Sequence, residues 1–180
     1  MKLVGLDFET ANPRNGSICA AGITIMQNGE IIEKREWLIR PHRTLDWMLP
    51  AFTEIHGIGY YDLRRSPEFF EIWPAIKNLI ERGECVVIHN AAFDLRHLHA
   101  VMDIYHMPPF SFDYICSLAV CRNLFPEMNS HSLDVMAKHF NIEFQHHDAL
   151  EDAIACATIV SQIGIQLNLI KRFEYHRKTK

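Results

Sequence analysis

The sequence has few of the features that mark collagen-like, membrane-spanning, secreted or disulfide-rich proteins. Glycine and proline number eight each among 180 residues, too few for a collagen-like or low-complexity chain. No apolar run reaches the roughly 20 residues that a membrane-spanning helix needs, and the N-terminus lacks the small-residue cleavage site of a signal peptide. The five cysteines contain no Cys-x-x-Cys pair, which favours buried thiols in a reducing compartment over a disulfide framework. We therefore expect a soluble cytoplasmic protein that contacts no membrane.

Positive charge is scarce outside the C-terminus. The net charge is −4, yet residues 171–180 hold five Lys or Arg against one Glu, so the other 170 residues carry −8. An acidic body is either an ordinary solvated surface or a sign of carboxylates gathered around cations. At roughly 150 residues per domain, the length predicts one domain over residues 1–170, followed by a basic tail over residues 171–180.

The apolar pattern predicts a mixed α/β domain. Strand-like runs cover residues 2–8, 17–27 and 30–40, and the Asn-Gly pair at 28–29 is a strong hairpin signal, so an antiparallel meander is expected. Residues 44–66 are irregular and are expected to form a long loop. The pattern also predicts strands at 85–88 and 110–112, and helices at 67–82, 92–107, 115–125, 132–140 and 149–169. A meander followed by alternating strands and helices indicates a mixed sheet covered by helices.

The first strand ends in two carboxylates. Side chains alternate along a strand, so Asp7 and Glu9 project from one face and Phe8 from the other. Two neighbouring carboxylates at the end of a buried strand repel each other, and a divalent cation would offset that repulsion. A polar strand end running into solvent is the alternative for this segment alone.

Two further segments carry acids at helix starts. Asp94 follows the strand at 85–88, in the first turn of the next helix, where the helix dipole alone favours an acid. The last long helix begins at His147-Asp148, with Asp148 as the expected N-cap and Glu151 completing a capping box. Because ligands bind beyond the carboxyl ends of strands in α/β sheets, we expect Asp94 to face the acids of the first strand.

The segments DFET, HNAAFD and HDALED, in this order over 152 residues, together resemble the DEDDh family of 3′→5′ exonucleases. The resemblance runs from Lys2 to about Ile163. It implies a ribonuclease-H-like fold with a mixed five-stranded sheet flanked by helices. It also implies that two divalent cations, Mg²⁺ or Mn²⁺, are held by four carboxylates, and that a histidine is the general base. The carboxylates are Asp7, Glu9, Asp94 and Asp152, and the base is His147.

The chemistry of phosphodiester hydrolysis explains these residue types. Hard carboxylate oxygens suit Mg²⁺ and Mn²⁺, which activate water and stabilise charge on the phosphate oxygens. An imidazole with an ordinary pKa near 6.5 can accept the proton of the attacking water at neutral pH.

The resemblance also suggests contacts with the terminal nucleotide of the substrate. Thr10 and Ala11 follow the metal strand, and the His56-Gly57 pair matches a segment by which the family approaches that nucleotide, although a plain turn is the alternative. With Asn90 of the second segment, these are the candidate substrate-binding residues.

The sequence leaves the substrate and the partners open. We expect hydrolysis of single-stranded DNA from its 3′ end, releasing nucleoside 5′-monophosphates, with an exoribonuclease as the first alternative. A non-catalytic polymerase-associated module would have lost at least one of the five residues, and a hydrolase of small phosphate esters would ignore oligonucleotide length. Finally, Gln166–Ile170 is similar to the pentapeptide by which bacterial replication proteins bind the sliding clamp; the alternative is that it only completes the last helix.

Overall fold

Three antiparallel strands open the chain in the computed structural model, which describes residues 1–177. They are β1 (Lys2–Thr10), β2 (Ile18–Gln27) and β3 (Glu30–Leu38), with β1 paired to β2 and β2 to β3. Asn28 and Gly29 both have positive φ, 53° and 85°, as a tight primed turn between two strands requires. The predicted meander is therefore confirmed.

The remaining strands extend the sheet on the other side of β1. Strand β4 (Cys85–Ile88) lies parallel to β1, and β5 (Phe110–Cys116) lies parallel to β4. Strand β6 (Lys171–Tyr175) is antiparallel to β5, so the order is β3-β2-β1-β4-β5-β6. The mixed α/β sheet is confirmed, but it has six strands where five were expected.

The sixth strand corrects the picture of the C-terminal tail. Residues 171–175 are part of the sheet, and Phe173 and Tyr175 are buried while the residues between and before them are exposed. Arg172 pairs with Asp113 of β5 at 2.8 Å across the strand pair. The last three residues of the expected tail, 178–180, lie outside the described residues.

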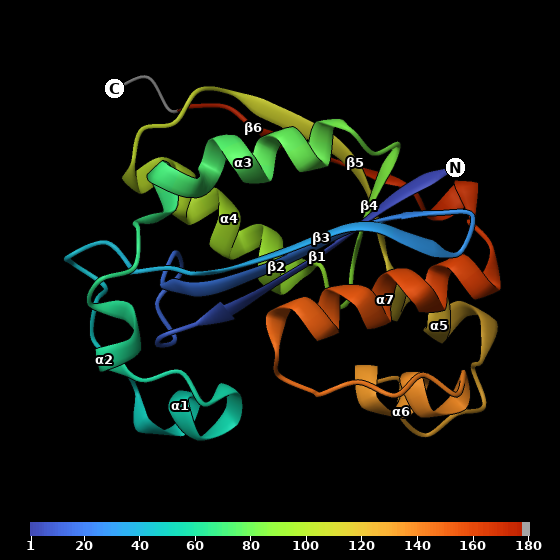
Figure 1. The fold of residues 1–180 in the computed structure, drawn as a ribbon. Coiled ribbons are helices and arrows are strands. Elements are labelled where there is room, and N and C mark those ends of the chain that lie inside the picture. Colours follow the sequence, from blue (N-terminus) through green and yellow to red (C-terminus); the bar gives the residue numbers. More distant parts are fainter. Residues whose placement is uncertain (178–180) are drawn as a thin grey trace.

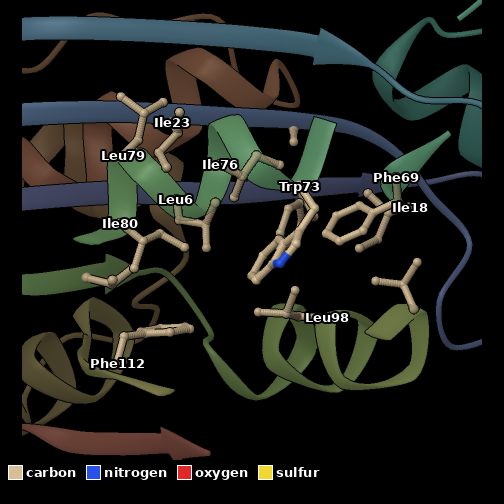
Figure 2. Close-up of a cluster of buried hydrophobic side chains, with 14 of the residues drawn as sticks. Leu6, Ile18, Ile23, Phe69, Trp73, Ile76, Leu79, Ile80, Leu98 and Phe112 are labelled. Atoms are coloured by element: carbon tan, nitrogen blue, oxygen red, sulfur yellow. The ribbon is translucent and has the colours of Figure 1, made fainter. Parts of the chain in front are cut away.

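Helices cover both faces of the sheet (Figure 1). One face carries α3 (Phe69–Glu81) and α4 (Ala92–Ile104), and the other carries α5 (Ser117–Leu124), α6 (Leu133–His139) and α7 (Ala149–Ile163). Strand β1 alternates between the two cores: Leu6 packs under α3, as Figure 2 shows, whereas Leu3 packs on the face covered by α7. This alternation puts Asp7 and Glu9 on the α7 face, as the strand period requires.

Two short helices replace the loop expected at residues 44–66. Helix α1 (Pro50–His56) has proline at its first position and ends at Gly57, whose φ of 76° is left-handed. Helix α2 (Tyr60–Leu63) follows directly. Pro50 and Gly57, residue types that favour loops, thus bracket a seven-residue helix.

Several helix boundaries also differ from the predicted ones, among them the starts of α3 and α5 and the ends of α4 and α7. Helix α3 begins after Glu68, whose backbone N–H donates to Glu71 at 2.7 Å, and it runs through Pro74 to Glu81. Helix α7 stops at Ile163 because Gly164 leaves the helical region with φ 83° and ψ 152°. A single 3₁₀ turn, Leu167–Leu169, follows where the prediction continued the helix to 169. Within the part of the chain that is described, no helix is both long and apolar enough to cross a membrane.

Candidate active site

A cavity of about 780 Å³ opens where β1 and β4 end. Strand β1 and the start of α4 supply one part of its wall, and the loop before α7 supplies another. All five residues assigned to catalysis from the sequence lie on it: Asp7, Glu9, Asp94, His147 and Asp152. The expectation that Asp94 faces the acids of the first strand is thereby confirmed.

Two glycines allow helix α7 to approach the sheet closely. A Cβ atom at Gly5 of β1 would overlap the carbonyl oxygen of Ala153, and one at Gly22 of β2 would overlap the carbonyl of Ala149. Without side chains at these points, the first turns of α7 lie directly on β1 and β2. This packing brings Asp152 beside the acids of β1.

The carboxylates of Asp7, Glu9 and Asp152 form one cluster, in which the three ligand atoms all lie within 4.8 Å of one another. Asp94 is held separately: its Oδ1 accepts a hydrogen bond from the Phe8 N–H at 3.1 Å, and the residue is 2% exposed. This bond fixes Asp94 against the strand that carries Asp7 and Glu9.

The four acids are held in a mutually repulsive arrangement. Burial raises the pKa of Asp7 well above its ordinary value, and the charges of Asp94, Asp152 and Glu9 raise it further. Burial raises the pKa of Glu9 and that of Asp94 to about 8 each, with the charge of Asp152 adding to both. Carboxylates that are crowded and short of water are the donor set that a hard divalent cation neutralises, so these residues fit Mg²⁺ or Mn²⁺.

His147 lies in the loop that enters α7. Its φ of 67° is left-handed, which is unusual for a residue with a side chain. The next residue, Asp148, caps the helix and accepts hydrogen bonds from Leu150 N at 3.1 Å and Glu151 N at 3.0 Å. The predicted N-cap is confirmed, but the Asp148 N–H donates to the Gln145 carbonyl at 3.4 Å instead of to Glu151, so the reciprocal half of the capping box is not formed.

His146 is a site residue that the sequence reasoning missed. Its Nδ1 lies 3.2 Å from Oδ1 of Asp152, while the His147 N–H donates to Oδ2 of the same carboxylate at 3.3 Å. The two imidazole rings stack with centroids 3.8 Å apart. Burial and the neighbouring His146 lower the pKa of His147. The signal in the sequence was the pair His146-His147, of which only the second member was considered.

Three of the five candidate substrate-binding residues line the cavity: Thr10, His56 and Asn90. His56 also ties α1 to β1, because its Nδ1 accepts from the Ile58 N–H at 3.1 Å and its Nε2 therefore donates to the Thr10 carbonyl at 3.2 Å. Asn90 has a left-handed φ of 56° at the end of β4, a conformation that asparagine tolerates.

Ala11 and Gly57 are not brought to the cavity. Ala11 is fully buried, its N–H donates to the Ser17 carbonyl at 2.8 Å, and its own carbonyl accepts from the Leu49 N–H at 2.9 Å. Gly57 is explained by the left-handed cap of α1, with no atom within 4 Å of an added Cβ.

The cavity is also lined by groups that the sequence reasoning did not assign. His89 places its Nδ1 2.9 Å from the Ser117 hydroxyl, and burial lowers its pKa to about 4, so this ring is neutral at pH 7. Arg122 supplies positive charge, and Phe52 and Phe93 supply apolar surface. The cavity is therefore lined by carboxylates, by an arginine and by the aromatic rings of two phenylalanines.

Both a family model and full-length relatives match most of this chain. The family described as Exonuclease matches residues 4–160. DNA polymerase III PolC-type of Thermotoga petrophila is 31% identical over 159 residues, which are 87% of this chain and 11% of the polymerase. The Bacillus subtilis PolC-type polymerase is 30% identical over 153 residues, 84% of this chain and 10% of that protein. The chain thus spans about a tenth of the length of these relatives.

Solved structures share the fold. Exonuclease X, in complex with 5′-overhanging duplex DNA, is 25% identical with a TM-score of 0.66, and the match covers 89% of this chain and 90% of that one. The nuclease domain of 3′hExo, a DEDDh family member bound to rAMP, has a TM-score of 0.75 at 16% identity and 90% coverage of each chain.

Proposed function

The chain belongs to the DEDDh-type 3′→5′ exonuclease family, and from this premise we propose that it removes nucleoside 5′-monophosphates one at a time from the 3′ end of single-stranded DNA. The single observation that carries the proposal is the gathering of Asp7, Glu9, Asp94, Asp152 and His147 around one cavity. These residues come from segments up to 145 positions apart, and all five line the same cavity.

The four carboxylates would hold two divalent cations, Mg²⁺ or Mn²⁺. Such cations supply stabilisation of phosphate charge and make water a better nucleophile at neutral pH. Asp7, Glu9 and Asp152 have their oxygens already grouped, and Asp94 is fixed by the Phe8 N–H. The protein therefore contributes a pre-arranged set of anionic ligands whose mutual repulsion favours cation binding.

His147 is the proposed general base. Its lowered pKa keeps the ring neutral at pH 7, so one ring nitrogen is free to accept the proton of the attacking water. The left-handed backbone at His147 and the capped start of α7 fix the loop that presents the ring. His146 assists by holding Oδ1 of Asp152, which orients the carboxylate toward the acids of β1.

The walls of the cavity suit the end of a single strand. Phe52 and Phe93 offer flat apolar faces for a base, and Arg122 offers positive charge for a phosphate. The PolC-type relatives are DNA polymerases by name, which favours DNA as the substrate. The 3′hExo nuclease domain was solved with rAMP, so an exoribonuclease is the second candidate.

The test compares single-stranded DNA and RNA of equal sequence, each labelled at the 5′ end, with Mg²⁺ or Mn²⁺. The proposal predicts a ladder that shortens from the 3′ end, release of nucleoside 5′-monophosphates, faster loss of DNA, and no reaction with the Asp7→Ala protein. Faster loss of RNA would retain the assignment of the residues and transfer the activity to RNA. Equal activity of Asp7→Ala would refute the site.

We also propose that Gln166–Ile170 contacts a sliding clamp. The segment forms a 3₁₀ turn, and Leu167 at its start is 75% exposed, whereas Leu169 and Ile170 pack partly against the core. The interpretation that these residues complete the last helix is wrong, since α7 ends at Ile163. Retention on immobilised bacterial clamp should be lost on Gln166→Ala with Leu167→Ala; retention equal to that of the unaltered protein would exclude the contact.

A further inference from the structure

Helix α2 exposes aromatic rings that its own packing does not use. Tyr60 is 54% exposed and Tyr61 is 78% exposed, and their rings meet edge to face with centroids 5.8 Å apart. The guanidinium of Arg64 lies 5.7 Å from the centre of the Tyr61 ring. Arg64 and Arg65 are both exposed, and within residues 1–177 neither forms an ion pair with an acid.

The tyrosines are not needed to fix α2. Leu63 of the same helix is 3% exposed and packs in a small core with Ala11 and Cys19. The Gly59 N–H donates to the Asp62 carboxylate at 2.8 Å, which closes the first turn. Both rings are therefore available for contact with a binding partner.

This surface adjoins the active-site cavity. Ala11, against which α2 packs, directly follows Thr10, which lines the cavity, and the β1 arrow in Figure 1 ends beside α1 and α2. Trp47 belongs to the same region: it is 44% exposed, and its carbonyl accepts from the Asn12 side-chain amide at 2.8 Å. Asn12 follows Ala11 in the loop that leaves β1.

We propose that Trp47, Tyr60, Tyr61, Arg64 and Arg65 form a stacking platform for the single strand on the 5′ side of the nucleotides held in the cavity. The inference rests on the proposed function, by which the cavity lined by Thr10 and the four acids receives the 3′ end of a strand. The platform stacks bases on the aromatic rings without reading their sequence, and its two arginines contact the phosphates.

The charge of the platform supports this occupant. The body of the chain is acidic, yet α2 and its C-terminal flank present two arginines beside the exposed rings of Tyr60 and Tyr61, and among residues 1–177 no acid forms an ion pair with either arginine. Arginine combined with exposed aromatic residues is what a strand of stacked bases joined by phosphates requires. A strand leaving an acidic metal site needs such a positive surface, because the acids around it repel its backbone.

The first test measures binding without turnover. Fluorescence anisotropy of a labelled single-stranded DNA of about 12 nucleotides is recorded in EDTA, where the carboxylates hold no cation. At about 1–3 kcal/mol per stacked base, Tyr61→Ala should weaken binding roughly 5- to 150-fold, and Tyr61→Phe should restore it. Arg64→Ala should lower the salt dependence by about one phosphate contact. Arg35→Ala, on the exposed strand β3, is the matched control and should bind as the unaltered protein does.

The second test compares substrate lengths. Variants of Tyr60 and Tyr61 should raise KM for the long oligonucleotide and leave kcat and KM for a dinucleotide unchanged, since a dinucleotide does not reach the platform. Unchanged affinity in the triple alanine variant of Trp47, Tyr60 and Tyr61 would overturn the proposal and assign these rings to a protein partner. Equal losses on the dinucleotide would overturn it too. Binding in EDTA that depends on the tyrosines, without any hydrolysis in Mn²⁺, would refute the proposed activity and retain the platform.

Discussion

Replacing Glu9 by glutamine should stabilise the protein when no divalent cation is present. The pKa of Glu9 rises from its ordinary 4.5 to about 8 through burial and the charges of Asp152 and Asp94. At pH 7 the unfolded chain carries an ionised Glu9, whereas folding forces it toward the protonated form. At 1.36 kcal/mol per pKa unit, that difference costs about 3 kcal/mol of stability, which glutamine at the same position avoids.

Thermal unfolding in EDTA at pH 7 measures the effect. For a chain of this length, about 3 kcal/mol corresponds to a Tm increase of roughly 6–12 °C for Glu9→Gln. Addition of Mn²⁺ should raise the Tm of the unaltered protein and raise that of the variant far less, because a ligand has been removed. Glu143→Gln, at an exposed position, is the control and should change neither value. A lower Tm for Glu9→Gln in EDTA would refute the electrostatic reasoning.

Three further predictions follow from the same geometry. The metal-free protein should lose stability as pH rises from about 4.5 to 8. In that range the raised pKa values of Glu9 and Asp94 make the folded state bind more protons than the unfolded chain does. Urea titrations at several pH values measure this, and a free energy of unfolding that does not change with pH in that range would show that the shifts are absent. His147→Ala should lower turnover by roughly 10²- to 10⁴-fold while Mn²⁺ still binds, and a loss of Mn²⁺ affinity in calorimetry would make His147 a ligand instead. Gly22→Ala should destabilise the fold by about 1–3 kcal/mol, because the added methyl group displaces the first turn of α7 at Ala149. An unchanged urea midpoint would show that α7 moves to accommodate the methyl group without loss of stability.

The parts of the fold predicted from the sequence are those with strong local signals. Asn28-Gly29 fixed the hairpin, and the alternation along β1 placed Asp7 and Glu9 on one face. The acids of three distant segments were brought together because each follows the carboxyl end of a strand or begins a helix beside one.

Strand β6 and helices α1 and α2 were not predicted, because their local sequence signals are weak or are masked by other features. In β6 the alternation of buried Phe173 and Tyr175 with charged residues is present, but the density of Lys and Arg there suggested a solvated tail. Helices α1 and α2 are too short for a periodic pattern to appear. Gly164 ended α7 although the apolar spacing continued to Ile170, since the backbone at that glycine, and not the spacing, decides where the helix stops.

The hydrogen bonds between side chains of the site depend on packing that no sequence pattern shows. No role was assigned to His146 from the sequence, and its contact with Asp152 forms beside the left-handed turn at His147. The family resemblance placed the backbone of Ala11 near the nucleotide, but its N–H and carbonyl groups are bonded inside the protein to Ser17 and Leu49.

The metal site is tested most directly by an anomalous-scattering map of crystals soaked in Mn²⁺. Two peaks should be bound by the carboxylates of Asp7, Glu9, Asp94 and Asp152, and crystals of Asp7→Ala should show no Mn²⁺ peak among them. A peak held only by the two histidines, or none near the four acids, would contradict the central claim that these carboxylates form the metal site of an exonuclease.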